Sequence, residues 1–75
     1  MRLLSYSGTQ NKFTGNKKKV VADLVCSNVP VVFPTTGKDI PGMGENFILL
    51  PGSTIWVINT AEVYALNEDG QWVNQ

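Results

Sequence analysis

Residues 51–73 read PGSTIWVINTAEVYALNEDGQWV, and this stretch decides the fold. Within it, residues 54–58 form a short run of β-branched and aromatic side chains, which is typical of a strand. The sequence therefore predicts a strand with apolar residues on both faces. Alternation along the strand divides them as follows: Ile55 and Val57 on one side, Trp56 and Ile58 on the other.

Two turns and two further strands follow this strand. Residues 59–60 (Asn-Thr) predict the first turn, because Asn59 tolerates left-handed geometry (positive φ) and both side chains can hydrogen-bond to their own backbone. Residues 63–66 predict a strand, and residues 67–70 (NEDG) predict a tight turn in which Gly70 adopts a positive φ. Residues 71–73 return as the last strand, so this part of the chain is predicted to form a β-hairpin.

The first part of the chain predicts shorter strands separated by loops. Residues 2–6 predict an edge strand and residues 20–26 a β-branched strand, with a polar connection over residues 7–19. Residues 31–33 lie between two prolines and predict only an edge strand or a very short one, because proline cannot donate to a ladder. Residues 35–46 hold three glycines and a proline and predict an irregular surface loop.

The pattern as a whole predicts an all-β fold. We expect a single small domain over residues 1–75, built as a small antiparallel sheet or a partly open barrel with a C-terminal β-hairpin and no substantial helix. The chain has 75 residues, and a core of this size supplies only about 3–5 kcal/mol of stability. Oligomerisation or docking onto a larger assembly is therefore expected to add to it.

The composition excludes several classes of function. Cys26 is the only cysteine and histidine is absent, so neither an intrachain disulfide nor a zinc site is expected. The formal net charge is zero, whereas nucleic-acid binders normally carry a basic surplus. Neither a signal peptide nor a membrane span is predicted, and the chain is expected to be made and used in a reducing cytoplasm, where a lone cysteine is unremarkable.

The polar clusters favour structural roles over binding roles. Lys17, Lys18 and Lys19 could contact phosphate or an acidic partner, but a solvated loop, or edge lysines that discourage strand-to-strand aggregation, explains them better. The set Gly37, Gly42 and Gly44 lacks the spacing of a phosphate-binding loop, because Pro41 interrupts it and no Lys-Ser/Thr pair follows.

No catalytic, cofactor-binding or metal site is predicted. Cys26 has no histidine to activate it and is interpreted as a small core residue. Glu62, Glu68 and Asp69 could supply paired carboxylates, but the last two lie in the predicted tight turn, where acidic residues are common and exposed. The protein is therefore not expected to be an enzyme.

Large apolar residues are the remaining candidates for a functional site. Most belong to the core, where either Tyr64 or Leu66 would face Trp72 across the hairpin. A small sheet has only one well-covered face, so either residues 47–50 fold across the second face or another subunit covers it. The predicted protein interface comprises Phe47, Ile48, Leu50, Trp56, Ile58, Tyr64 and Trp72.

A segment of small tailed-bacteriophage virion proteins is similar to this chain. Its pattern is Gly-Ser-x-x-x-Val-Ile-(Asp/Asn)-Thr-x-(Glu/Asp)-Val-Tyr, followed by an aromatic residue or Leu, a turn and Trp, often after a Pro-Thr-x-Gly loop. The loop is matched by residues 34–37, and the likeness extends over residues 34–73. The other matching positions are Gly52, Ser53, Val57, Ile58, Asn59, Thr60, Glu62, Val63, Tyr64 and Trp72.

The resemblance implies a virion structural protein of the head-fibre or minor structural type. Since the chain lacks the longer fibre-forming regions of some relatives, it implies a compact subunit associated with capsid, neck or tail. Such proteins are multi-copy, so the implied partners are other virion proteins and further copies of the chain, with no nucleic acid or membrane. The alternative is a phage- or prophage-encoded module that binds a host protein or a carbohydrate.

Overall fold

The computed structural model describes residues 1–8 and 18–75 of the chain, and it confirms the all-β class. The helical content of these residues is a single short 3₁₀ turn, η1 (Gly37–Asp39). Six strands form one sheet. They are β1 (Arg2–Gly8), β2 (Lys18–Cys26), β3 (Phe47–Leu49), β4 (Thr54–Val57), β5 (Glu62–Leu66) and β6 (Trp72–Asn74).

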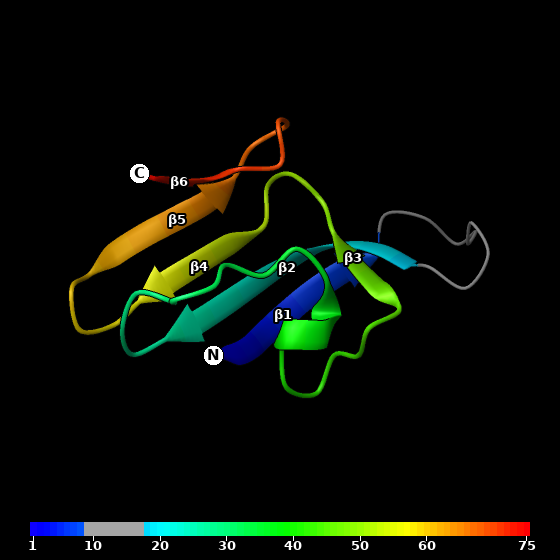
Figure 1. Cartoon of the computed structure of the whole chain (residues 1–75), viewed down its shortest axis with the longest axis horizontal. Coiled ribbons are helices and arrows are strands. Elements are labelled where there is room, and N and C mark those ends of the chain that lie inside the picture. The colour runs from blue at the N-terminus through cyan, green and yellow to red at the C-terminus, as the bar shows by residue number, and fades with distance from the viewer. Residues whose placement is uncertain (9–17) are drawn as a thin grey trace.

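The sheet is mixed and open (Figure 1). The strands lie in the order β1-β2-β4-β5-β6, and β3 also pairs with β2. β2 runs antiparallel to β1 but parallel to both β3 and β4, which differs from the expected antiparallel arrangement. The nine residues of β2 accommodate these two short strands one after the other.

A buried serine joins β3 and β4 into one path along β2. The chain leaves the sheet at Pro51 and Gly52, and Gly52 adopts the positive φ that this turn requires. Ser53 is fully buried at the point of return. Its hydroxyl donates to the Leu50 carbonyl (2.7 Å) and accepts from the Ala22 N–H (3.1 Å). The side chain thus binds the β2 backbone at the gap between β3 and β4, where none of the described strands pairs with β2 on that side.

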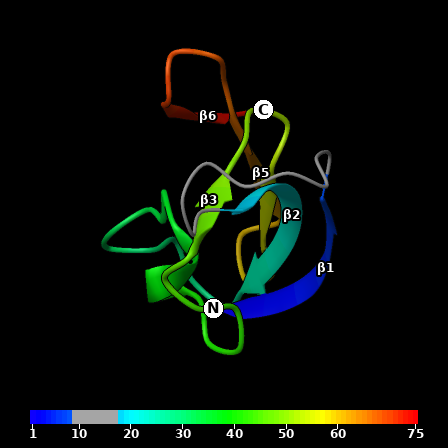
Figure 2. The ribbon, with the colours of Figure 1, turned by 90° about the vertical axis from the view of Figure 1, so that its right-hand side faces the viewer.

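The segment between β2 and β3 covers one face of the sheet. Parallel strands need a long crossover connection, and residues 27–46 supply it. Figure 2 shows this segment on one side of the strands and β1 on the other. Ile40 and Met43 are buried in the core, so the prediction of a surface loop over residues 35–46 is wrong for these positions.

Residues 31–33 form no strand, in contrast to the expectation of an edge strand or a short one. The backbone bends at Val31, whose side chain is fully exposed. Phe33 turns inward, and its ring lies 5.0 Å from that of Tyr64 and 6.2 Å from that of Trp72, between ring centroids. The segment therefore contributes to the fold through side chains and not through backbone pairing.

The core lies between the sheet and residues 27–46. It takes alternate residues from β2 and β4, as the pleat of a strand requires. The other face of the sheet, called the outer face below, has no covering layer among residues 1–8 and 18–75. The buried apolar residues of the core are Val20, Ala22, Leu24, Ile40, Met43, Leu49, Ile55, Val57 and Leu66.

The predicted turns are present, with one change of residue. In the β5–β6 hairpin the Asn67 side chain accepts from the backbone N–H groups of Asp69 (3.0 Å) and Gln71 (2.9 Å), and Gly70 has the expected positive φ. In the β4–β5 turn the positive φ belongs to Ala61 and not to Asn59.

The edges of the sheet also follow the prediction, with small shifts. β1 is an edge strand, as expected, but it extends to Gly8, so residues 7 and 8 are not part of a loop. Lys18 and Lys19 likewise belong to β2. The remainder of the predicted polar connection, residues 9–17, lies outside the described residues.

Candidate functional site

Apolar side chains gather on the outer face where three strands lie side by side. The register places Trp56 of β4 between Val25 of β2 and Val63 of β5. Residues directly opposite each other share a face of the sheet, so the three side chains form one row. Val25 is buried beneath its neighbours, whereas Trp56 remains 53% exposed and Val63 39% exposed.

The row continues to the end of β4 and across to β6. Ile58 follows Trp56 on the same face and is 53% exposed. Val73 of β6 lies opposite Ala65 and is 43% exposed. We call the set Val25, Trp56, Ile58, Val63 and Val73 the outer patch. The strand predicted over residues 54–58 is observed as β4, which ends at Val57, with Ile58 in the turn that follows, and apolar side chains lie on both of its faces.

The sequence predicted that either residues 47–50 or another subunit covers this face, and residues 47–50 do not cover it. Residues 47–49 form β3 within the sheet, beside β2, and do not fold across the second face. Ile48 is half-buried and pairs with Thr36 in an isolated bridge. Leu50 is also half-buried, and its N–H donates to the Val20 carbonyl (2.7 Å). Both residues are thus engaged in the fold.

Three aromatic members of the predicted interface lie on the core side. Phe47, Tyr64 and Trp72 are half-buried and pack against the buried core. The Trp72 indole N–H donates to the Pro34 carbonyl (2.7 Å), which ties the last strand to the crossover segment. Leu66 lies opposite Trp72, so of the two predicted cross-strand partners it is Leu66 that faces this ring. Only Trp56 and Ile58 of the seven predicted residues reach the outer patch.

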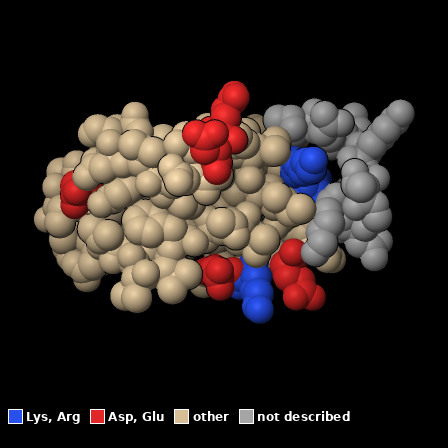
Figure 3. All heavy atoms as spheres, turned by 45° about the horizontal axis from the view of Figure 1, so that its top comes forward, with Lys and Arg blue, Asp and Glu red and all other residues tan. Residues whose placement is uncertain are grey.

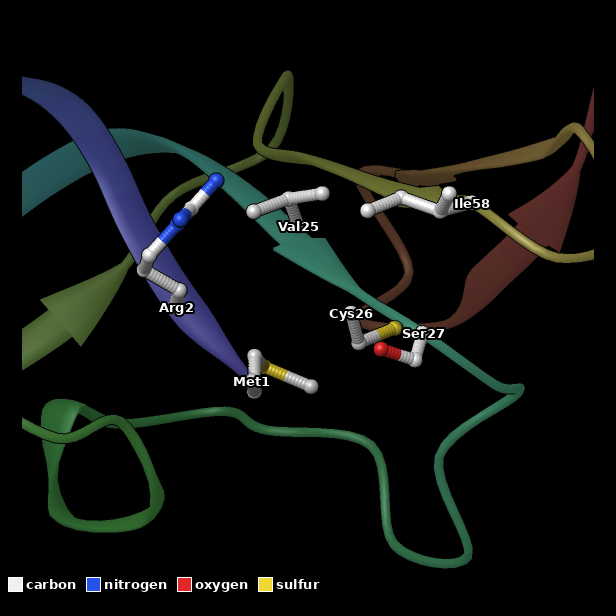
Figure 4. Close-up of a pocket in the computed structure, with 6 residues that line it drawn as sticks. All are labelled: Met1, Arg2, Val25, Cys26, Ser27 and Ile58. Atoms are coloured by element: carbon white, nitrogen blue, oxygen red, sulfur yellow. The ribbon is translucent and has the colours of Figure 1, made fainter.

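A pocket of about 230 Å³ adjoins the outer patch at the end of β2. In Figure 4, Arg2, Val25 and Ile58 lie in a row, and the other lining residues occupy the opposite side. Arg2 comes from edge strand β1 and lies opposite Val25 in the register. The lining residues are Met1, Arg2, Val25, Cys26, Ser27 and Ile58. Sequence reasoning missed Arg2, because only the β1–β2 register brings it here.

The Cys26 thiol in this pocket has low reactivity. Cys26 is half-buried at the end of β2 and packs against the core, in agreement with its interpretation as a small core residue. Burial raises the pKa of the Cys26 thiol, because the thiolate loses solvation. The group is therefore protonated at neutral pH and adds no negative charge to the pocket.

Alkylation of Cys26 is expected to be slow in the native protein. Since the thiolate is the nucleophile, a raised pKa lowers the reactive fraction at every pH below it. Iodoacetamide near neutral pH should react several-fold more slowly with the native protein than with the same protein unfolded in urea. Equal rates, followed by mass spectrometry, would contradict this account of the thiol.

The described residues of the basic cluster, Lys18 and Lys19, do not form a binding site. The Lys18 ammonium lies over the Phe47 ring, 5.6 Å from its centroid, and Lys19 is exposed on β2. Lys17 lies outside the described residues. Figure 3 shows the charged side chains of one face as small separate groups of both signs on a mostly uncharged surface.

The glycines of the crossover have structural roles. A Cβ on Gly37 would collide with the Gly44 carbonyl and with the Met43 side chain, so only glycine fits there. Gly42 and Gly44 have positive φ, which glycine adopts without strain.

Glu62 begins β5 and lies apart from Glu68 and Asp69, which are neighbours in the turn after that strand. Glu62 accepts hydrogen bonds from the Tyr64 hydroxyl (3.5 Å) and the Asn74 amide within the hairpin. Glu68 and Asp69 are exposed in the turn, as predicted. Across residues 1–8 and 18–75, no group of three or more His, Cys, Asp or Glu side chains is arranged to hold a metal ion. No helix in the described part of the chain has the length and apolarity to cross a membrane.

The outer patch with its adjoining pocket is thus the candidate site, and its geometry is that of a docking surface. Comparison of the chain with models of protein families, with curated proteins and with solved structures finds no match.

Proposed function

We propose that the protein is a bacteriophage virion structural protein, a multi-copy β module that docks onto capsid, neck or tail proteins through the outer patch. The observation that carries the docking role is the exposure of Trp56 at the centre of an apolar sheet face. Contiguous apolar patches on small proteins mark interaction sites, and tryptophan is among the commonest anchors of such interfaces.

The small size of the fold supports this role. A chain of 75 residues buries a limited core. Covering the outer face with a partner removes further apolar surface from water, which stabilises the bound form over the free one. The protein is thus expected to gain stability in the assembly.

The resemblance to phage virion proteins supports the proposal that the partner is another virion protein. Two of its matching residues build the β3–β4 junction, since Gly52 makes the turn and Ser53 bridges to β2. Two others, Tyr64 and Trp72, hold the hairpin against the crossover segment. Trp56 falls at an unspecified position of the pattern, as expected of a residue whose identity depends on the particular partner.

The alternative of a carbohydrate-binding or host-binding module is favoured less by the geometry. It would place Trp56, Tyr64 and Trp72 together as a stacking platform. Instead, Tyr64 and Trp72 are half-buried on the core side, and Trp56 alone is exposed on the outer face. A single exposed indole flanked by aliphatic side chains is more typical of a protein interface.

Mass spectrometry of purified phage particles tests the proposal. Particles from infected cells that express the protein should contain it in many copies, and it should remain with them through density-gradient purification. Particles that lack the protein although the infected cells contain it would overturn the virion assignment. A stable monomer that instead captures one host protein, or binds a carbohydrate, would establish the alternative.

Trp56→Ala is expected to weaken docking strongly while leaving the fold intact. Loss of a central interface tryptophan costs about 2 kcal/mol or more of binding free energy, which is roughly a 30-fold loss of affinity. Binding to particles assembled without the protein is measured by co-sedimentation, and folding by circular dichroism.

Val31→Ala is the matched control for this substitution, because it truncates a fully exposed side chain of the crossover segment. Its affinity for the particles should be unchanged. If Trp56→Ala bound as tightly as the wild type, the outer patch would not be the docking surface.

A further inference from the structure

The pocket and the outer patch form one continuous surface. They share Val25 and Ile58, which line the pocket and also belong to the patch. At about 230 Å³ the pocket is smaller than the cavities that hold whole drug-sized ligands. It has the size for a single side chain of a partner that lies across the patch.

The charge at the pocket is positive. Arg2 is exposed, and no carboxylate among residues 1–8 and 18–75 forms an ion pair with it. Asp23 is the acidic residue of the same sheet face, two residues before Val25 on β2. Its two carboxylate oxygens instead accept from the hydroxyls of Ser5 (3.1 Å) and Thr54 (2.9 Å).

The remaining lining suits a carboxylate rather than a cation. Ser27 contributes a hydroxyl, which can donate to an anion. Cys26 is held in its neutral form by burial, so it does not repel one. Val25 and Ile58 form the apolar part of the lining, against which the methylene groups of an acidic side chain can pack.

We infer that the pocket receives a Glu or Asp side chain of the docking partner, which pairs with Arg2 while flanking apolar residues of the partner cover Trp56 and Ile58. This inference rests on the proposed docking function and adds the chemistry of the partner. The guanidinium fork matches a carboxylate in a bidentate geometry, and such a pair fixes the register of the partner on the patch.

Two blocked tripeptides test the inference with the isolated protein. They are acetyl-Leu-Glu-Leu-amide and its uncharged counterpart acetyl-Leu-Gln-Leu-amide, each titrated into isotope-labelled protein and followed by NMR amide shifts. The glutamate peptide should shift the amides of Arg2, Val25 and Ile58 and should bind up to about five-fold more tightly, as expected for a partly exposed ion pair. High salt should reduce this preference.

Arg2→Gln should weaken the preference by about two-fold or more, because it deletes the guanidinium charge and keeps a polar side chain. Lys19→Gln is the matched control, since it deletes an exposed positive charge six residues before Val25 on the same strand, about 20 Å away. It should preserve the preference. Equal binding of the two peptides by the wild type, a preference that is undiminished in Arg2→Gln, or shifts confined to other residues would each overturn the inference.

This test is independent of the virion assignment. The peptides report on the pocket in the free protein, whereas the particle experiments report on what the protein docks to. A preference for the glutamate peptide would stand even if the protein were absent from particles. Conversely, a protein that co-purifies with particles but shows no preference would keep the proposed function and lose the acidic anchor.

Discussion

Ile55→Ala is expected to unfold most of the protein under native conditions. Ile55 is fully buried in the centre of the core. Truncation of such a side chain costs about 2–5 kcal/mol, which is comparable with the roughly 3–5 kcal/mol that a domain of this size possesses. Urea unfolding followed by tryptophan fluorescence should show a transition midpoint near zero denaturant.

Ile58→Ala is the matched control, because it makes the same isoleucine-to-alanine truncation three residues further along the chain. Ile58 is 53% exposed on the outer face, so its truncation should change the free energy of unfolding by only about 0.5 kcal/mol. It should instead weaken docking, together with Trp56→Ala. Equal destabilisation by the two isoleucine substitutions would contradict the assignment of the two faces.

Ser53→Ala is expected to have the second largest effect. The substitution leaves the buried N–H of Ala22 without its acceptor, and it removes the bond to the Leu50 carbonyl. A buried unsatisfied donor costs about 1–3 kcal/mol. The urea midpoint should therefore fall markedly, and hydrogen exchange at the Ala22 amide should become faster than at the neighbouring amides of β2.

Ser5→Ala serves as the control for the loss of a hydroxyl. The Ser5 hydroxyl also donates a hydrogen bond, to Asp23, but the residue is exposed on the edge strand. Its removal should change stability by no more than about 0.5 kcal/mol. If Ala22 kept its protection in Ser53→Ala, the serine would not be the group that joins β3 and β4 to β2.

The hairpin region could be predicted because its signals are local. The pleat alternates from one residue to the next, so the opposite faces of Ile55 and Trp56 follow from the sequence alone. The turn over residues 67–70 depends on Asn67 and Gly70, which act on their own backbone. Neither feature needs knowledge of what lies elsewhere in the chain.

The crossover segment could not be predicted in the same way. Its glycines and prolines indicate a loop, and nothing in the pattern shows that Ile40 and Met43 enter the core. Their burial follows from the parallel pairing of β2 with β3 and β4, which forces residues 27–46 to cross one face of the sheet. Pairing between distant strands is a property of the whole chain.

The sequence predicted an apolar surface on the second face of the sheet, but it did not predict which residues form that surface. Residue type alone groups all large apolar side chains together, whereas the register assigns each to a face. Phe47, Tyr64 and Trp72 lie on the core side for this reason. Val25, Val63 and Val73 join the outer patch because β2, β5 and β6 bring them beside Trp56 or its neighbours.

By itself, the sequence determined that this is a small β protein whose strand over residues 54–58 is apolar on both faces, because alternation and turn chemistry act over a few residues. The tertiary structure decided which of those faces is covered. It also decided that Arg2, more than fifty residues away, lies at the end of the exposed face, where it lines the same pocket as Ile58. Strand order and register are set by the best burial of the whole chain, and no single segment contains that information.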